Sequence, residues 1–207
     1  MSFGLVKHNN NSLSAVTSVG LTQGKMTLIK EQTASSSSSI SFVHGSSSVV
    51  FDSTYPIYMF SWINLHSSND DVFLEFNLST DSGSNYNVAK TTTFFQGYHT
   101  ENGSDAGLSY QTSRDLAQGT GSQYLTRQIG NGNDDVGSGY LHLFNPSSTT
   151  FVKHFIATSS NNYGGDTYYM NNFIGGYGNT TSAVDAVQFS MSSGNIDAGD
   201  ICLYGIA

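Results

Sequence analysis

Histidine has the broadest chemistry of the side chains in this sequence, since it ligates metals and transfers protons near neutral pH. The six histidines are His8, His44, His66, His99, His142 and His154. No two have the spacing of a zinc-binding pair on a helix, and no helix is expected to carry one. His142 and His154 fall in strand-like segments with apolar neighbours, which is typical of structural histidines. The sequence therefore predicts no metal site.

Paired carboxylates are the next candidates for chemistry, and they occur at Asp70-Asp71 and Asp134-Asp135. A glycosidase holds two carboxylates about 5–10 Å apart in a cleft, whereas adjacent aspartates in a turn are typical solvated turn formers. The Gly-x-Ser-x-Gly elbow of serine hydrolases is absent. Serine is so abundant that no single serine identifies a Ser/His/Asp triad. We expect no catalytic residue and no enzymatic activity.

The loop 130–135, Gly-Asn-Gly-Asn-Asp-Asp, offers the hard oxygen ligands that calcium prefers. It lacks the spacing of an EF-hand and its bidentate glutamate, so calcium is not the expected occupant, although the sequence leaves the question open. The glycine-rich segments 164–165 and 175–178 lack the strand-to-helix context and the Lys-Ser/Thr of a phosphate-binding loop. No cofactor is expected.

A cluster of tyrosines and asparagines near residue 170 allows two interpretations. Its members are Tyr163, Tyr168, Tyr169, Asn171, Asn172 and Tyr177. Aromatic rings stack on sugar faces and amides bind hydroxyl groups, so these residues are a candidate glycan-binding patch. Tyrosine is also favoured in strands and at protein interfaces. The core or interface interpretation is preferred, with glycan binding as the alternative.

The composition limits the partners of this 207-residue chain. Charged residues make up 11%, and the net charge is −8. An acidic chain without a basic patch is not expected to bind nucleic acid or anionic membranes. No segment resembles a secretory signal or a transmembrane helix, so membrane insertion is not expected. The single cysteine, Cys202, lies in an apolar strand and is interpreted as a buried thiol.

The elements that position these residues are predicted to be strands. About ten strand-like segments alternate with turn signals, and hardly any window has a helical period. The predicted fold is all-β, an antiparallel two-sheet β-sandwich of jelly-roll type over residues 26–207. Residues 1–25 are predicted to be an N-terminal arm. The longest loop is expected at 100–121, with a short helix at 108–116.

Two strand-like segments are apolar on both faces. In 57–65, Ile57, Met59, Ile63 and Leu65 are expected to point one way, and Tyr58, Phe60 and Trp62 the other. The segment 201–206 likewise has no polar face. Because an exposed apolar edge invites aggregation, it is expected inside a sheet. A second sheet would cover one face of each segment, and a loop or a neighbouring subunit the other.

Three segments of the C-terminal half carry a family resemblance. They are 139–148, a strand ending in Asn145-Pro146; 183–196, Ala-Val-Asp-Ala-Val-Gln-Phe-Ser-Met-Ser-Ser-Gly-Asn-Ile; and 199–206, Gly-Asp-Ile-Cys-Leu-Tyr-Gly-Ile. Their form resembles the C-terminal signature of small jelly-roll structural proteins of tailed-bacteriophage virions. The turn at 79–86 is similar to theirs as well. The resemblance covers roughly residues 26–207 and implies a virion component.

Two functions follow as hypotheses. The first is a non-enzymatic capsid decoration or cement protein, located in the virion on the capsid surface. It would form a homo-oligomer, with a trimer favoured, and bind phage capsid proteins. Its arm would anchor it or be swapped between subunits through Phe3, Leu5, Val6, Leu13 and Val16. The alternative is the receptor-binding head of a tail fibre or appendage, which recognises host surface glycan through the tyrosine cluster and the 100–121 loop.

Overall fold

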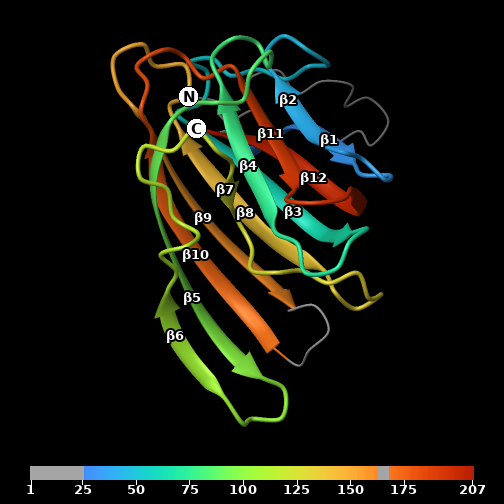
Figure 1. Ribbon diagram of the computed structural model, residues 1–207. Coiled ribbons are helices and arrows are strands. Elements are labelled where there is room, and N and C mark those ends of the chain that lie inside the picture. The colour runs from blue at the N-terminus through green and yellow to red at the C-terminus, as the bar shows by residue number, and fades with distance from the viewer. Residues whose placement is uncertain (1–25, 163–167) are drawn as a thin grey trace, which may run out of the picture.

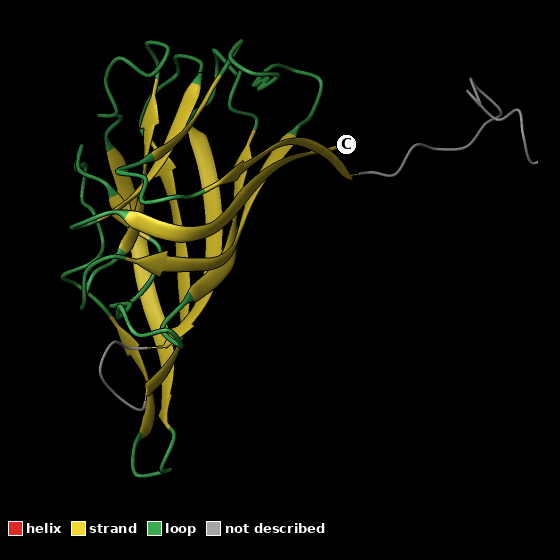
Figure 2. Cartoon of the chain, turned by 90° about the vertical axis from the view of Figure 1, so that its right-hand side faces the viewer, coloured by secondary structure: helices red, strands yellow, loops and turns green. Residues whose placement is uncertain are grey.

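The computed structural model describes residues 26–162 and 168–207, and these residues contain strands but no helix. Twelve strands form two antiparallel sheets, which Figures 1 and 2 show as two facing layers. The predicted all-β, two-sheet sandwich is therefore confirmed. The expected arm at 1–25, with its five apolar candidates, lies outside the described residues, and so does Tyr163.

The larger sheet has eight strands, in the spatial order β1-β12-β3-β8-β9-β10-β5-β6. These strands are β1 (Met26–Thr33), β12 (Ile196–Ile206), β3 (Ile57–Ser67), β8 (Gly137–Phe144), β9 (Lys153–Asn162), β10 (Tyr168–Gly178), β5 (Lys90–Thr100) and β6 (Ala106–Tyr110). The smaller sheet consists of β2 (Ile40–Val43), β11 (Ala186–Met191), β4 (Leu74–Ser79) and β7 (Gln123–Tyr124), in that spatial order. In Figure 1 the β5–β6 hairpin reaches well below the smaller sheet, so the larger sheet overhangs it at that end.

The chain crosses from one sheet to the other at most of its connections. Strands β1, β3, β8 and β12 belong to the larger sheet, and β2, β4, β7 and β11 to the smaller. The exceptions are the run β8-β9-β10 and the hairpin β5-β6, which stay in the larger sheet. We interpret β1, β3, β8 and β12 of the larger sheet and the four strands of the smaller sheet as a jelly roll. The other four strands, β5, β6, β9 and β10, widen its larger sheet. The jelly-roll type stays an interpretation, whereas the sandwich is observed.

The inward side chains of both sheets form one core that is rich in aromatic residues. Phe60 and Trp62 point inward from β3 and are at most 1% exposed. Phe189 of the smaller sheet packs against Phe60, with ring centroids 5.3 Å apart. Phe76 packs edge-on against Phe155 at 5.0 Å. Burial of each such side chain contributes about 1.5–3 kcal/mol, and this contribution holds the two layers together.

A bulge in β3 changes which of its side chains face the core. Asn64 has a φ of 50°, and the pairing of β3 with β8 slips between Trp62 and Leu65. The backbone N–H of Asn64 donates to the hydroxyl of Ser138 at 3.0 Å. Leu65 is consequently turned inward and fully buried. The expectation that Leu65 shares a face with Ile63 is wrong, because alternation does not continue through a bulge.

The C-terminal strand β12 lies inside the larger sheet, as the sequence predicts. It pairs with β1 on one side and with β3 on the other. Ile201 and Leu203 point into the core and are fully buried, and Cys202 on the opposite face is 5% exposed. Burial raises the pKa of the Cys202 thiol. The prediction of a buried thiol is therefore confirmed.

The segment 100–121 contains a strand where the sequence predicts a long loop with a short helix at 108–116. Strand β6 pairs with β5 from Phe95 opposite Tyr110 to His99 opposite Ala106. The prediction of a helix at 108–116 is wrong because the pairing of two adjacent strands outweighs weak local preferences.

Among the described residues, no helix is long and apolar enough to cross a membrane.

Lys90 at the start of β5 is fully buried, and the partners of its ammonium group are uncharged. Its Nζ donates to the carbonyl oxygen of Val88 at 2.8 Å and to Oδ1 of Asn77. Burial lowers the pKa of Lys90 to about 8, against about 10.4 for an unfolded lysine. Between these values the unfolded chain binds more protons, so the contribution of Lys90 to the free energy of unfolding increases as the pH rises.

We expect the substitution Lys90→Met to raise the free energy of unfolding at pH 7 by about 1 kcal/mol, because removal of a buried charge without a counter-ion outweighs the loss of its hydrogen bonds to Val88 and Asn77. The gain should shrink towards pH 10, where Lys90 is already neutral in the folded protein. Urea unfolding of both proteins at pH 7 and pH 10, followed through the fluorescence of Trp62, measures the difference. Other titrating groups are common to both proteins. A gain that is equal at the two pH values would contradict the assignment.

Candidate functional site

The side of the larger sheet that faces away from the smaller sheet, called the outer face below, carries exposed large apolar side chains. Of the eleven such residues in the described chain, ten lie on this face. They are Met26, Leu28, Ile63, Phe95, Leu108, Tyr110, Tyr140, Ile156, Tyr169 and Phe173. The remaining one, Phe151, lies in the turn between β8 and β9. An uncovered apolar surface on this scale marks a contact site.

Pairing between the strands aligns the outer-face side chains in rows. One row runs from β6 to β12 through Tyr110, Phe95, Phe173, Thr158, Tyr140, Ser61 and Cys202. The next row runs from β5 to β12 through Thr93, Gly175, Ile156, His142, Met59 and Tyr204. Between β6 and β12 neither row contains Lys, Arg, Asp or Glu, and Glu31 of β1 follows Cys202 at the end of the first row. Burial lowers the pKa of His142, which favours the neutral imidazole. Between β6 and β12 the two rows are therefore uncharged as well as largely apolar.

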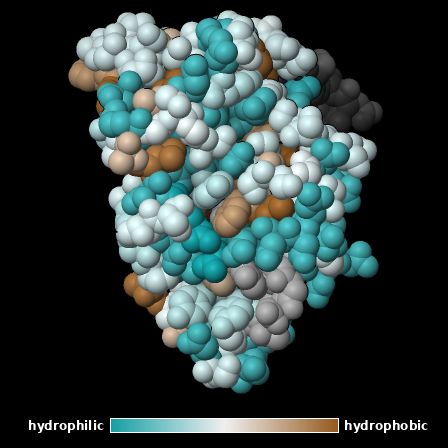
Figure 3. Space-filling view, in the orientation of Figure 1, coloured by the Kyte–Doolittle hydropathy of each residue, from teal (hydrophilic) through white to brown (hydrophobic). Residues whose placement is uncertain are grey.

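The outer face has the size of a protein interface. Its ten large side chains are between 39% and 76% exposed. At about 200 Å² for each side chain, they expose on the order of 1,000 Å² together. For comparison, one partner contributes about 800 Å² to a stable interface. Figure 3 shows one side of the molecule, and on that side apolar residues are scattered among hydrophilic ones.

The structure divides the tyrosine and asparagine cluster between the two faces of β10. Tyr169, Asn171 and Tyr177 alternate to the outer face, whereas Tyr168 and Asn172 point to the inner face. The described members therefore do not form one patch. The first three belong with the outer face, and the other two lie where the larger sheet overhangs the smaller one.

A pocket of about 480 Å³ lies on the inner side of the overhang. Its lining comes from β5, β6 and β10, from the residues that flank β6, and from the segment that follows β7. The lining residues are Gln96, Tyr98, Asp105, Ser109, Gln111, Arg127, Tyr168 and Met170. They combine two aromatic rings with amide, hydroxyl and charged groups. Such a lining suits a small polar ligand with some apolar surface.

A chain of buried amides runs from this pocket into the sheet. Gln96 and Asn172 are opposite each other on β5 and β10 and are at most 2% exposed. Nδ2 of Asn172 donates to Oγ of Ser159 and to Oδ1 of Asn161, both at 2.9 Å. Oε1 of Gln96 and Oδ1 of Asn172 have no hydrogen-bond partner among the described residues. Buried acceptors without a donor are rare, because their desolvation is not compensated.

A second hollow, of about 330 Å³, brings Glu75 and Asp115 into one lining. Burial raises the pKa of Glu75, whose Oε1 accepts a hydrogen bond from Ser190. A carboxyl group with a raised pKa is a candidate proton donor. The carboxylate of Asp115 already accepts a hydrogen bond from the hydroxyl of Tyr110 at 2.6 Å. The paired aspartates of the sequence line neither this hollow nor the larger pocket.

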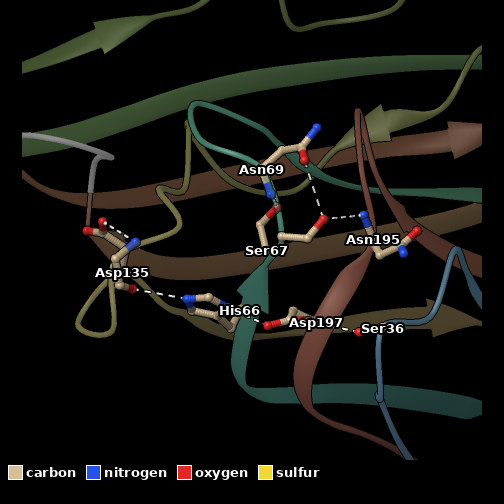
Figure 4. Close-up of polar contacts among 9 residues, drawn as sticks. Ser36, His66, Ser67, Asn69, Asp135, Asn195 and Asp197 are labelled. Carbon is tan, nitrogen blue, oxygen red and sulfur yellow. Dashed lines mark hydrogen bonds and ion pairs between the residues drawn. The ribbon is translucent and has the colours of Figure 1, made fainter.

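The loop 130–135 is held by contacts of its own, which Figure 4 shows. Oδ2 of Asp135 accepts a hydrogen bond from the N–H of Gly132 at 3.2 Å. The carbonyl oxygen of Gly132 lies 3.1 Å from Nε2 of His66, whose Nδ1 lies 3.5 Å from Oδ2 of Asp197. Within the described ranges no group of three or more His, Cys, Asp or Glu side chains is placed to hold a metal. Asp135 therefore organises the turn itself.

Sequence patterns alone do not identify the polar residues of the larger pocket. Gln96 and Arg127 were missed, whereas Asp105, Ser109 and Gln111 lie within the 100–121 segment that the sequence names as a candidate recognition loop without singling them out. The one available signal is Gln96, a polar residue at the next inward position after the buried Phe94. The pocket exists because β5, β6 and β10 meet in the sheet, and that pairing joins segments about 70 residues apart.

Comparison with known proteins adds no relative. No protein-family model matches the chain, no curated protein matches it, and no solved structure matches it. The outer face and the larger pocket are therefore the features on which a function has to rest.

Proposed function

We propose that this chain is a non-enzymatic structural protein of a bacteriophage virion, most simply a capsid decoration or cement protein. The observation that carries the proposal is the outer face, a broad and exposed apolar surface whose two central rows contain no charged side chain between β6 and β12. A protein with this surface acts by burying it against other proteins, and the bound state then stabilises the assembly. The resemblance of segments 139–148, 183–196 and 199–206 to phage virion proteins supplies the virion context. The proposed location is the capsid surface, with phage capsid proteins as partners.

We assign the outer face to a second copy of this chain. The protein has a net charge of −8, so two copies repel each other through most of their surfaces. The two central rows of the outer face contain no charged side chain between β6 and β12, and contact there opposes no like charges. Homo-oligomer interfaces are also more apolar than other interfaces. The assembly is therefore a homo-oligomer, with a trimer favoured, and its remaining surfaces are free to contact the capsid.

The second candidate is the receptor-binding head of a tail fibre or appendage. The pocket of the overhang favours this candidate, because tyrosines, amides and a carboxylate line it. The same oligomer would then present several copies of the pocket to a host surface glycan, and multiple copies raise the overall avidity.

Cryo-electron microscopy of purified particles of the phage that encodes this chain tests both candidates. Copies at regular positions on the head, in contact with each other through the outer face, would support the decoration role. Density at the tail or on an appendage alone would replace that role with receptor binding. Particles that lack the chain, as judged by mass spectrometry of the same preparation, would overturn both.

A further inference from the structure

We propose that the pocket of the overhang is a binding site for a neutral saccharide. The site goes beyond the assembly role and lies on the opposite face of the sheet from the outer face. Covering the outer face with a second copy leaves the pocket open. An experiment can therefore support self-association and contradict saccharide binding, or the reverse.

The floor of the pocket contains a buried acceptor that the chain does not satisfy. Gln96 is 2% exposed and lines the pocket, and its Oε1 has no hydrogen-bond partner among the described residues. Its Nε2 has only a long contact of 3.9 Å with the sulfur of Met170. A ligand hydroxyl is a donor of the right size for this oxygen. Because the amide is already positioned by its strand, binding would cost little reordering.

The aromatic wall supplies the apolar part of the recognition. Tyr98 and Tyr168 face each other across β5 and β10, with ring centroids 6.0 Å apart and an angle of 57° between the rings. Tyr98 lies so close over Gly107 that a Cβ there would be 2.8 Å from the phenolic oxygen. The absence of a side chain at Gly107 therefore leaves the space that this ring occupies. Sugar rings present C–H groups on one face and hydroxyl groups at their rim, which suits a tilted aromatic pair with polar groups around it.

The polar rim carries no net charge and so favours neutral ligands over strongly charged ones. Asp105 and Arg127 contribute charges of opposite sign to the lining, and the other polar groups, including Ser109 and Gln111, are neutral. The two charges cancel, so the lining offers no net attraction to an anion or to a cation. Carboxylate, amide and guanidinium groups bind the paired hydroxyls of a sugar through both lone pairs and N–H donors. A volume of about 480 Å³ lies within the range of small-ligand sites and accommodates one or two sugar rings.

The test uses the full chain on an array of neutral hexoses, N-acetylhexosamines, deoxyhexoses and their oligomers, with sialic and uronic acids as charged comparators. Hits are measured again in solution by calorimetry, which removes the effect of avidity. We expect binding to a neutral glycan. We expect Asp105→Asn, a change at an exposed side chain, to weaken it about tenfold or more through the loss of a charged acceptor. Asp70→Asn, in a turn outside the pocket lining, is the matched control and should bind like the unchanged protein.

Gln96→Met provides the sharper variant. It keeps the length of the side chain and removes the unsatisfied oxygen, so we expect an equal or higher melting temperature together with a loss of glycan binding. A purely structural glutamine would show the opposite pattern. Absence of binding to every glycan at millimolar concentration would overturn the proposal. So would binding that both pocket variants retain, or binding restricted to acidic sugars. Phe173→Asp, on the outer face, should leave the solution affinity per site unchanged.

Discussion

The substitution Phe173→Asp is expected to convert the assembled protein into monomers. Phe173 lies in the central row of the outer face and stacks on Phe95, with ring centroids 5.1 Å apart and an angle of 12° between the rings. An aspartate there would have to be desolvated against an apolar surface in every interface. We expect the association to weaken by about 100-fold or more, since about 3 kcal/mol corresponds to that factor. Sedimentation velocity over a range of protein concentrations measures the change.

The matched control is Phe151→Asp. Phe151 is 69% exposed, more than Phe173 at 39%, but it lies outside the outer face. This variant should assemble like the unchanged protein. Circular dichroism of all three proteins shows whether the monomers are folded. An unchanged protein that is monomeric at every concentration would refute self-association. A Phe173→Asp variant that still assembles would show that the contact lies on another surface.

The largest effect on stability is expected from Gly139→Ala in β8. A Cβ at this position would lie 2.4 Å from the carbonyl oxygen of Thr158 and 2.6 Å from the ring of Trp62. Neither atom can move freely, because one belongs to the backbone of β9 and the other to a side chain packed in the core. We expect the free energy of unfolding to fall by about 3 kcal/mol or more, at the upper end of overpacking effects. Urea unfolding followed by Trp62 fluorescence measures it.

Gly121→Ala is the control for this substitution. Nothing lies within 4 Å of a Cβ at Gly121, and its φ is not positive. The expected change in the free energy of unfolding is within about 0.5 kcal/mol. Both variants are compared at one protein concentration, because association would otherwise contribute to the measured stability. Equal stability of the two variants would show that β8 and β9 separate more readily than their packing indicates.

Alternating side chains were sufficient to predict most of the strands. The inward set Val72, Leu74, Phe76 and Leu78 is at most 4% exposed, as the pattern in the sequence predicts. The prediction fails for Asn77, which is expected to face solvent but is buried. Its Nδ2 donates to the carbonyl oxygens of Tyr86 and Thr120 in segments that fold over the smaller sheet. Local patterns describe one strand and contain no information about what covers it.

The two candidate sites could be predicted only in part for the same reason. The apolar character of both faces of β3 and β12 is visible in the sequence, and it indicates a surface that needs a partner. The alignment of Phe95, Phe173 and Tyr140 in one row depends on the pairing of β5, β10, β9 and β8. Strand β10 likewise continues through Gly175 and Gly176 to Gly178, although glycine weakens a strand locally. Register between distant strands is set by the assembled sheet, so it does not appear in the local sequence.

The position of β12 between β1 and β3 has a consequence for the folding kinetics. Met26 pairs with Ile206, and Ile57 pairs with the same residue from the other side. Closing the sheet thus requires the association of segments about 180 and about 150 residues apart. Such pairings pay their loop-closure entropy before they gain contacts, so folding in milliseconds to seconds is expected rather than in microseconds. Until β12 is in place, β1 and β3 each have an unpaired edge, and that intermediate is the species most prone to aggregate.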